Sequence, residues 1–333
     1  MPISHVLLFL TYRCNLRCDF CLSFNRYWRA DASLPLPAAV EPRVFLRPAR
    51  DFREMSTADI VERVIPQCEK NGVEAIALSG GEVLVRRDAP DIFRALGASS
   101  MRWCFDSNLM MCNEEIAGVV IASRCDAVFV SIDGTEDIHN RLRCNPKGFE
   151  RTLNGLRCLV DARRAARGGQ TSITINCVLQ PGNESVPEDI VRLALDEGAD
   201  ELSFQLLSER AYMNRFDAQA AAASLGAACR MAEARGLPAH VYPLANPNEE
   251  SLRSWFSMPL SDRFFNGCTY IHTNLRIDPE GNVIPCLEYA LGNILEQELS
   301  AIWTGDAYET FRRHLAQDGP FEACLRCCNM TVA

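Results

Sequence analysis

Two hydrophobic periods alternate along the first two thirds of the chain. Apolar runs of strand length are followed by longer amphipathic stretches, and turn-forming residues separate them. The runs that predict strands are residues 5–11, 74–79, 101–106, 127–132, 172–179 and 201–207. The stretches that predict helices are residues 56–71, 90–96, 113–123, 148–166, 187–197 and 218–235. Six such strand–helix units predict an α/β fold with a parallel sheet and right-handed crossovers.

Two of the predicted helices have well-defined ends. Ser56 can cap the first helix, Gly72 follows its last turn, and Pro66 predicts a kink inside it. Pro187 stands at the first position of another helix, and Gly198 follows its end. Proline at the start and glycine past the end is the usual asymmetry of helices, so both segments are predicted with defined bounds.

Two parts of the chain depart from this pattern. Residues 22–54 are irregular and hold four prolines, and loops of this length in a compact domain are usually lids, binding loops or insertions. Because the segment directly follows a cysteine-rich loop, we expect it to cover an active site; a passive insertion is the alternative. Beyond Pro238 the sequence changes to Pro, Asn, Ser and short strands. We therefore predict one domain at 1–243 and a second at 244–333.

Composition and charge narrow the classes of protein. The 333 residues are 48% hydrophobic and 23% charged, as in globular proteins, and the formal net charge is −9. That negative charge argues against a nucleic-acid partner and weakly fits a cationic substrate. No apolar run is long enough to span a membrane, and no signal peptide precedes the first strand. The sixteen cysteines are therefore expected to be metal ligands and reduced thiols in the cytoplasm.

Three cysteines follow the first predicted strand with the spacing C-x3-C-x2-C. They are Cys14, Cys18 and Cys21. Three thiolates can hold a [4Fe–4S] cluster by three of its irons and leave the fourth iron open to another ligand. A zinc site would need four closed ligands, and no histidine or fourth cysteine lies nearby in the sequence. The alternative is that the three thiols bind no metal and pack as small hydrophobic side chains.

This spacing, with Phe20 directly before the last cysteine, resembles the signature of the radical SAM superfamily. In that family the open iron binds the amino and carboxylate groups of S-adenosylmethionine (SAM). One electron from the cluster then cleaves SAM to the 5′-deoxyadenosyl radical. The resemblance implies a partial (β/α)6 TIM-like barrel with its active site at the carboxyl ends of the strands. It also implies that Phe20 lies in the cofactor site and that a flavodoxin or ferredoxin supplies the electron.

The ends of the second and third strands carry further polar and glycine residues. Gly80, Gly81 and Glu82 resemble the GGE motif of the same family, whose backbone and carboxylate hold the ammonium group of SAM. Two glycines allow a close approach of the backbone to a ligand. Ser107 and Asn108 end the third strand and are predicted to lie in the same cofactor site. A glycine turn after a strand is ordinary by itself, so the motif depends on the cysteine loop beside it.

The run that follows the fourth strand resembles the S-x-D-G-x4-H-x3-R pattern of the family members that carry auxiliary clusters. The resemblance implies that Ser131 and Asp133 lie by the ribose of SAM and that Arg143 lies near its carboxylate. A guanidinium suits a carboxylate because its donors match two oxygens at once. His139 is expected to stabilise the loop and not to act as acid or base. Each polar residue alone could also be an ordinary strand-end turn residue.

A second cysteine set lies in the last third of the chain: Cys268, Cys286, Cys324 and Cys327. The first two flank a predicted hairpin whose tip is residues 278–282, and four thiolates from a hairpin and a distant C-x2-C can meet at one metal site. A zinc ribbon would use the same ligands. The spacing resembles the twitch domain, a shortened SPASM domain with one auxiliary [4Fe–4S] cluster. Cys328 is then a spare thiol or an alternative to Cys327.

Eight more cysteines are expected to be mostly core thiols: Cys68, Cys104, Cys112, Cys125, Cys144, Cys158, Cys177 and Cys229. One of them could donate a hydrogen atom to a substrate radical, with Cys104, Cys144 and Cys177 as the candidates. The two resemblances leave a gap after the sixth strand, where substrate contacts are expected. The candidates there are Glu209, Arg210 and Tyr212.

The resemblance predicts the first chemical step but not the substrate. We expect a two-electron oxidation of a small polar natural-product intermediate, such as an amino sugar or cyclitol, with the auxiliary cluster as electron acceptor. The alternative is a maturase of a ribosomally made peptide that forms a crosslink or epimerises a carbon. Since the chain starts at the first barrel strand, that alternative would need a separate recognition protein. A third class, an iron–sulfur electron carrier or zinc module, has no use for the GGE motif or an open iron.

Overall fold

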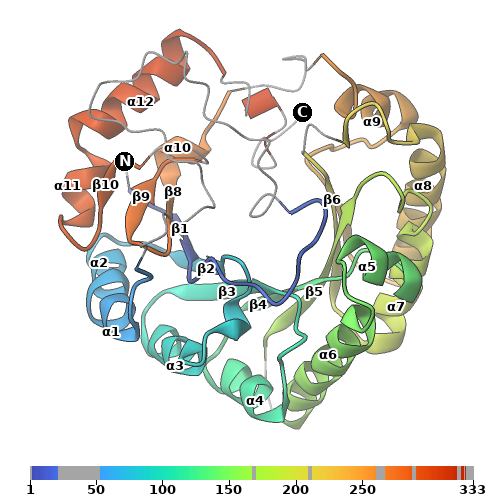
Figure 1. The fold of residues 1–333 in the computed structure, drawn as a ribbon, viewed down its shortest axis with the longest axis horizontal. Helices are drawn as coiled ribbons and strands as arrows, with labels where there is room; N and C mark the ends of the chain where they lie inside the picture. The colour runs from blue at the N-terminus through green and yellow to red at the C-terminus, as the bar shows by residue number, and fades with distance from the viewer. Residues whose placement is uncertain are drawn as a thin grey trace.

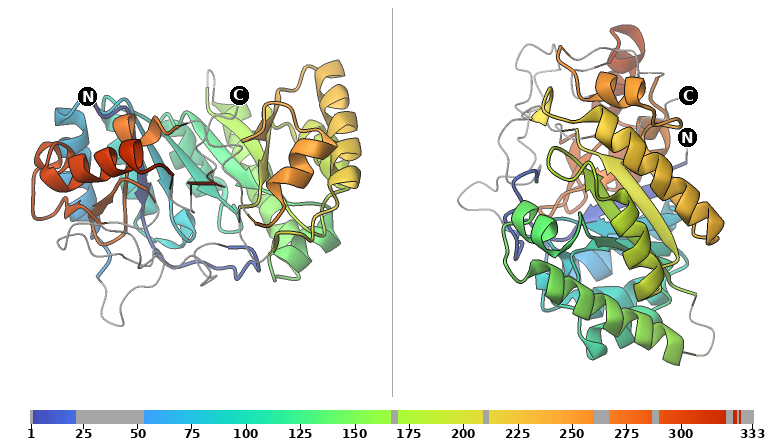
Figure 2. Two further views of the ribbon diagram at one scale, coloured as in Figure 1. Left: turned by 90° about the horizontal axis from the view of Figure 1, so that it is seen from above. Right: turned by 90° about the vertical axis from the view of Figure 1, so that its right-hand side faces the viewer.

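One continuous sheet runs through the molecule. The computed structural model describes residues 2–21, 53–166, 170–208, 212–259, 267–286, 290–320, 324–325 and 327. The sheet has ten strands in the order β10-β9-β8-β1-β2-β3-β4-β5-β6-β7. It curves into a partial barrel with helices around the outside (Figure 1). Figure 2 shows the strands in the middle, α12 at the β1 side and α8 at the opposite side.

The strands confirm the predicted α/β fold. They are β1 (His5–Phe9), β2 (Ala75–Ser79), β3 (Arg102–Ser107), β4 (Ala127–Ser131), β5 (Ser172–Leu179), β6 (Glu201–Leu206), β7 (Ala239–Tyr242), β8 (Asn274–Ile277), β9 (Asn282–Ile284) and β10 (Gly292–Asn293). All six predicted strands are present as β1 to β6, and each pairs in parallel with its neighbour. β7 adds a seventh parallel strand beside β6.

The helices follow the strands as predicted, with some additions. They are α1 (Thr57–Asp59), α2 (Ile65–Lys70), α3 (Ala89–Ala98), α4 (Glu114–Ala122), α5 (Glu136–Leu142), α6 (Gly148–Ala165), α7 (Pro187–Glu197), α8 (Ala218–Ala234), α9 (Glu249–Trp255), α10 (Tyr270–Thr273), α11 (Leu299–Trp303) and α12 (Asp306–Gln317). A π-helical turn, η1 (Ile60–Val64), joins α1 to α2, and a 3-10 turn, η2 (Val83–Val85), follows β2. The π-helical turn ends two residues before Pro66, which lacks an N–H and crowds the preceding turn. The kink at Pro66 stays a prediction.

Alternate strand residues give the barrel an outer and an inner face. In β1, Val6 and Leu8 are fully buried, whereas the residues between them keep some exposure. The buried positions pack against the helices, and Phe93 of α3 stacks on Trp103 and Phe105 of β3 at ring distances of 5.1 and 5.2 Å. Burying an aromatic or aliphatic side chain of this size contributes about 1.5–3 kcal/mol. The hydrophobic core therefore lies between the sheet and its helices, and the other face looks into the barrel.

The C-terminal hairpin belongs to the same sheet as the barrel. β8 pairs in parallel with β1, with Leu275 opposite Val6, and β9 and β10 continue antiparallel from it. The turn between β8 and β9 confirms the predicted hairpin tip, where Gly281 has a φ of +88°. The two predicted parts of the chain thus share one sheet, and their division near residue 243 stays a prediction.

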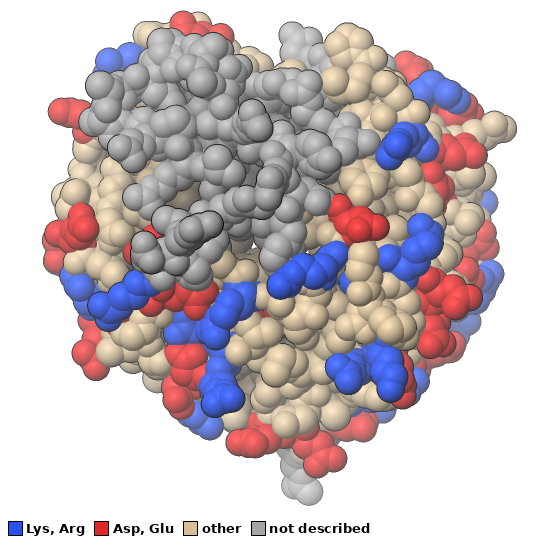
Figure 3. Space-filling model, in the orientation of Figure 1, with Lys and Arg blue, Asp and Glu red and all other residues tan. Residues whose placement is uncertain are grey.

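Charged side chains of both signs lie next to one another on the face shown in Figure 3, among the residues that the structure describes. Within the described part of the chain, no helix is both long enough and apolar enough to cross a membrane.

Candidate functional site

The predicted motifs meet at the carboxyl ends of β1 to β4. The backbone N–H of Gly81 donates to the carbonyl of Thr11 at 2.8 Å, and that of Glu82 donates to the carbonyl of Arg13 at 2.9 Å. The side-chain amide of Asn108 donates to Oδ1 of Asn15 at 2.8 Å. Parallel strands bring their carboxyl ends to one edge, so loops far apart in sequence contact the same cysteine loop.

Glycine is required at positions 80 and 81 because the cysteine loop lies so close. Gly80 has a φ of +136°, and a Cβ added there would lie 2.5 Å from the carbonyl oxygen of Thr11. A Cβ on Gly81 would lie 2.3 Å from the carbonyl oxygen of Arg13. Real Cβ atoms do not approach oxygen this closely, so a side chain is excluded by the protein itself. The motif thereby locks the β2 turn against the loop that carries the thiols.

The first cysteine set fits a cluster held by three thiolates. Cys14, Cys18 and Cys21 are partly buried and form no disulfide. The N–H of Leu16 lies 3.4 Å from Sγ of Cys14, where it can stabilise a thiolate. Burial, with a smaller contribution from the neighbouring Cys21, raises the pKa of Cys14 to about 11 and that of Cys18 to about 12. Such thiols are protonated at neutral pH unless iron takes the place of the proton.

In the described part of the chain, no group of three or more His, Cys, Asp or Glu side chains is arranged to hold a single metal ion. A [4Fe–4S] cluster would attach each thiolate to a different iron.

Glu82 is fixed from three sides and keeps one acceptor position. It is 2% exposed. Its Oε1 accepts from the N–H of Leu84 at 3.0 Å and from the hydroxyl of Ser107 at 2.7 Å, and its Oε2 accepts from the N–H of Asn108 at 2.8 Å. Burial raises the pKa of Glu82, and these hydrogen bonds and the charge of Arg143 oppose that rise. A carboxylate has about four acceptor positions, so one remains for a ligand. Ser107 and Asn108 therefore hold Glu82 in place.

Asp133 and Arg143 form a buried ion pair. Asp133 has no solvent exposure; its Oδ2 accepts from Nε of Arg143 at 2.7 Å, and its Oδ1 accepts from the N–H of Val178 at 2.9 Å. Burial lowers the pKa of Arg143, but Asp133 and the nearby thiols raise it by more, so the guanidinium stays charged. Nη1 and Nη2 of Arg143 make no hydrogen bond to any described residue, and the group lies 5.6 Å from the ring centre of Phe20. Arg143 thus keeps donors for an anionic ligand, and Asp133 keeps further acceptor positions beyond these two hydrogen bonds, so its predicted contact with the ribose stays a prediction.

Ser131 and His139 lie near Asp133 in the same part of the site. Ser131 ends β4 on the inner face of the barrel, opposite Asn176 of β5. His139 is buried, and its Nδ1 accepts from the N–H of Asp133 at 3.3 Å. Burial and the charge of Arg143 lower the pKa of His139 to about 3, so the imidazole is neutral. A neutral acceptor inside the loop fits the predicted stabilising role.

The second cysteine set also comes together in the fold. Burial raises the pKa of Cys286, and the other three thiols of the set, on Cys324, Cys327 and Cys268, raise it further. Cys268 and Cys324 pack with Ile271 of α10 against α12. The four cysteines thus lie in one region, with Cys268 before α10, Cys286 after β9, and Cys324 and Cys327 in the C-terminal segment. That they are the ligands of an auxiliary [4Fe–4S] cluster stays a prediction. Cys328 lies outside the described residues.

The predicted substrate contacts and lid are only partly visible. Glu209 and Arg210 lie outside the described residues, as do residues 22–52 of the predicted lid. Tyr212 is half-buried and packs against the main core, so its role stays a prediction. Glu54, where the lid segment ends, accepts from the hydroxyl of Thr11 at 2.6 Å, which brings this segment back to the cysteine loop.

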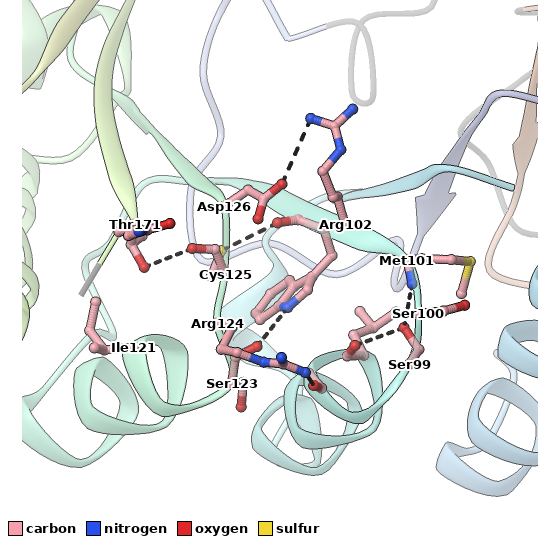
Figure 4. Close-up of a pocket in the computed structure, with 14 residues that line it drawn as sticks. Ser99, Ser100, Met101, Arg102, Ile121, Ser123, Arg124, Cys125, Asp126 and Thr171 are labelled. Carbon is pink, nitrogen blue, oxygen red and sulfur yellow. Dashed lines mark hydrogen bonds and ion pairs between the residues drawn. The ribbon is translucent and has the colours of Figure 1, made fainter. Parts of the chain in front are cut away.

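The pocket in Figure 4 lies away from these residues. Its volume is about 620 Å³, and it is formed by the ends of α3 and α4 and the start of β3, with an ion pair of Arg102 and Asp126 at 4.0 Å. These are the amino ends of the strands. In barrels of this kind that end serves stability and the carboxyl end serves catalysis, so the pocket is no candidate active site.

Two inner-face residues were missed by the sequence analysis. Asp106 of β3 and Asn176 of β5 look into the barrel, but neither belongs to a recognised motif. The signal for Asp106 was present: Trp103 and Phe105 alternate with Cys104 and Asp106, which is the pattern of a strand with one polar face.

Comparisons with known proteins agree with this site. The model of the radical SAM superfamily matches residues 8–194, and that of the SPASM iron–sulfur cluster-binding domain matches residues 268–328. PqqA peptide cyclase from Streptomyces rochei is 26% identical over 343 aligned positions, which cover 97% of this chain and 80% of the relative. The structure of Streptococcus suis SuiB bound to precursor peptide SuiA superposes with a TM-score of 0.68 at 16% identity, covering 94% of this chain and 67% of SuiB. Native anSMEcpe with bound AdoMet gives a TM-score of 0.60 at 15% identity, covering 92% of this chain and 82% of that chain.

The family match covers more than half of the chain, and the fold, the cysteine loop and the glycine turn agree with it. The protein is therefore a member of the radical SAM superfamily that binds SAM and a [4Fe–4S] cluster in its barrel and carries a C-terminal SPASM-type iron–sulfur domain.

Proposed function

We propose that this radical SAM enzyme is a maturase that crosslinks a ribosomally made peptide. The observation that carries the proposal is the similarity to PqqA peptide cyclase over 97% of this chain. A neighbour in fold, SuiB, is bound to a precursor peptide. These relatives favour the peptide alternative over the oxidation of an amino sugar or cyclitol that we expected first.

The barrel residues have separate tasks in this proposal. Cys14, Cys18 and Cys21 hold the first cluster. Glu82 offers its remaining acceptor position to the ammonium of SAM, and Arg143 offers its Nη donors to the carboxylate. When bound, SAM and the cluster supply the radical that removes a hydrogen atom from a substrate carbon. The rigid hydrogen bonding of Glu82 fixes the cofactor, so that the radical forms at one place above the inner face of the barrel.

Four further residues support Glu82 and Arg143 in this proposal. Asp133 keeps Arg143 charged and oriented inside the protein, and Ser107 and Asn108 hold Glu82. Ser131, at the end of β4 on the inner face, would contact the ribose of SAM together with Asp133.

The second cysteine set suits an oxidative outcome. A crosslink between two carbons removes two hydrogen atoms from the peptide in total. One leaves as a hydrogen atom, and the other leaves as a proton and an electron. The set of Cys268, Cys286, Cys324 and Cys327 would hold the cluster that receives the electron. A flavodoxin or ferredoxin would supply the first electron, as expected from the sequence.

The proposal is tested with the reconstituted enzyme and the short peptides encoded beside its gene. Incubation with SAM and reductant should yield 5′-deoxyadenosine and a peptide lighter by two hydrogen atoms, with a crosslink visible in its fragmentation. A peptide of unchanged mass that carries one solvent deuteron would indicate epimerisation. Oxidation of amino sugars or cyclitols with no change in any such peptide would restore the small-molecule function.

A further inference from the structure

One acidic residue on the inner face of the barrel is assigned no role by the known motifs. Asp106 lies in β3, where Trp103 and Phe105 point outward and are 2% and 1% exposed. Asp106 points to the opposite face and is solvent-accessible. It directly precedes Ser107, which holds Glu82, so its carboxylate lies one step deeper in the barrel than the proposed SAM site.

The carboxylate of Asp106 lacks a cationic partner among the described residues. Its neighbours there are the hydroxyl of Ser79 on β2, which hydrogen-bonds it, and the carboxylate of Glu82, which repels it. The surrounding protein and this repulsion raise the pKa of Asp106 to about 6, even though water can reach the group. A carboxylate that is open to solvent and has no cation beside it is available to bind a cationic group of a ligand.

A second acceptor on the same face lacks a donor. Asn176 lies in β5 opposite Ser131, and its Oδ1 is buried without a hydrogen-bond partner in the described structure. The register places Phe129 opposite Asp106 on the intervening strand β4, on the same face. A carboxylate without a cation and an amide oxygen without a donor, beside an aromatic ring, are the kind of groups that bind a ligand with polar donors.

We propose that Asp106 binds a protonated amine or guanidinium of the substrate inside the barrel, with Asn176 as a further acceptor. The proposal rests on the radical SAM function and adds the class of substrate: the molecule carries a basic group close to the carbon that reacts. In a precursor peptide this group is a lysine or arginine side chain, and in a small metabolite it is an amino group. The positive charge supplies the cation that Asp106 lacks, and Asn176, two strands away, would accept from a different donor of the same substrate.

Binding of paired probes tests this without turnover. The reconstituted enzyme, loaded with SAM and without reductant, is titrated calorimetrically with Nα-acetyl-lysine amide and with its uncharged counterpart Nα-acetyl-norleucine amide. A second pair is glucosamine and glucose. We expect the charged member of at least one pair to bind at least tenfold more tightly than its partner, and Asp106→Asn to remove that difference. The lysine pair would identify a basic peptide residue, and the glucosamine pair a small amino compound.

A matched control uses another carboxylate of the inner face. Glu201 of β6 already pairs with His240, with Oε1 3.0 Å from Nε2, so Glu201→Gln should leave the probe preference unchanged. Equal binding of charged and neutral probes by the wild-type enzyme would overturn the proposal. So would a large loss of SAM affinity in Asp106→Asn, which would place this carboxylate in the cofactor site. If the proposed peptide maturation is wrong, this is detected by a different measurement, the mass of the peptide after turnover by the wild-type enzyme. The probe-binding result does not depend on that measurement.

Discussion

The two cysteine sets are assembled in different ways. Cys14, Cys18 and Cys21 lie within eight residues on one loop, which the β2 turn fixes through backbone hydrogen bonds. The thiols of the second set come from a hairpin, a short helix and the end of the chain, and meet only because α10 and α12 pack together. The first set therefore depends on local geometry, and the second depends on the completed fold.

The largest effects on iron content and SAM cleavage are expected when each cysteine set is removed separately. The enzyme with both clusters should hold about eight irons, four in each. Replacing Cys14, Cys18 and Cys21 by Ala should leave about half of the iron and abolish SAM cleavage. Replacing Cys324 and Cys327 by Ala should also leave about half of the iron, but it should retain SAM cleavage. Iron analysis measures the cluster content of each variant, and assays of 5′-deoxyadenosine measure SAM cleavage. Zinc at the second set would contradict the cluster assignment.

The next largest effect is expected on the free energy of unfolding, when the buried ion pair of Asp133 and Arg143 is broken. Asp133→Ala leaves the Arg143 guanidinium buried without its counter-charge, which should lower the free energy of unfolding by about 3–5 kcal/mol. Urea unfolding of the reconstituted enzyme measures this loss. The exposed pair of Asp91 and Arg94 is a matched control, and Asp91→Ala should cost less than about 1 kcal/mol. A small effect for Asp133→Ala would show that water reaches Arg143.

Substitution of Glu82 tests whether the region around the first cysteine set binds SAM. Glu82→Gln keeps the size of the side chain but removes the charge that would face the ammonium of SAM. Charged hydrogen bonds contribute about 1.5–3 kcal/mol, so SAM should bind roughly 10- to 100-fold more weakly. Equilibrium dialysis with both clusters intact measures the affinity. Unchanged affinity would remove Glu82 from the cofactor site.

The smallest effect is expected at the contact between the two regions. The hydroxyl of Tyr12, two residues before Cys14, lies 3.3 Å from both Asp278 and Glu280 at the hairpin tip. Tyr12→Phe should lower the free energy of unfolding by about 0.5–1.5 kcal/mol, measured by urea unfolding. Both clusters should remain, since no ligand is removed. Loss of iron from the second set would show that this contact is needed to assemble it.

Local patterns in the sequence predicted more than contacts between distant segments. The six strands and the first cysteine loop were predictable because period and spacing lie within short windows. α5 was missed because its seven residues hold few apolar positions, and β7 because its residues retain exposure and give little hydrophobic signal. The pairing of β8 with β1 joins residues about 270 positions apart, and no local pattern encodes such a register.

Contacts between distant segments also set the partners of the polar residues that the motifs single out. The resemblance places Asp133 by the ribose, and the structure adds that its oxygens accept hydrogen bonds from Arg143, ten residues later, and from the backbone of β5. The ribose contact of Asp133 stays a prediction. Asp106 was overlooked although it alternates with buried aromatics, because the absence of a cationic partner appears only when the neighbouring strands are in place.

The pairing of β8 with β1 has a consequence for biosynthesis. A chain that leaves the ribosome from its amino end can form β1 to β7 while β8 is still unmade. Until then β1 is an edge strand, with a row of unpaired backbone groups next to the first cysteine loop. The nascent protein thus exposes a surface that can pair with other chains, and the synthesis and pairing of β8 close it. A chain truncated before residue 274 should accordingly aggregate through β1, even though its barrel strands are complete.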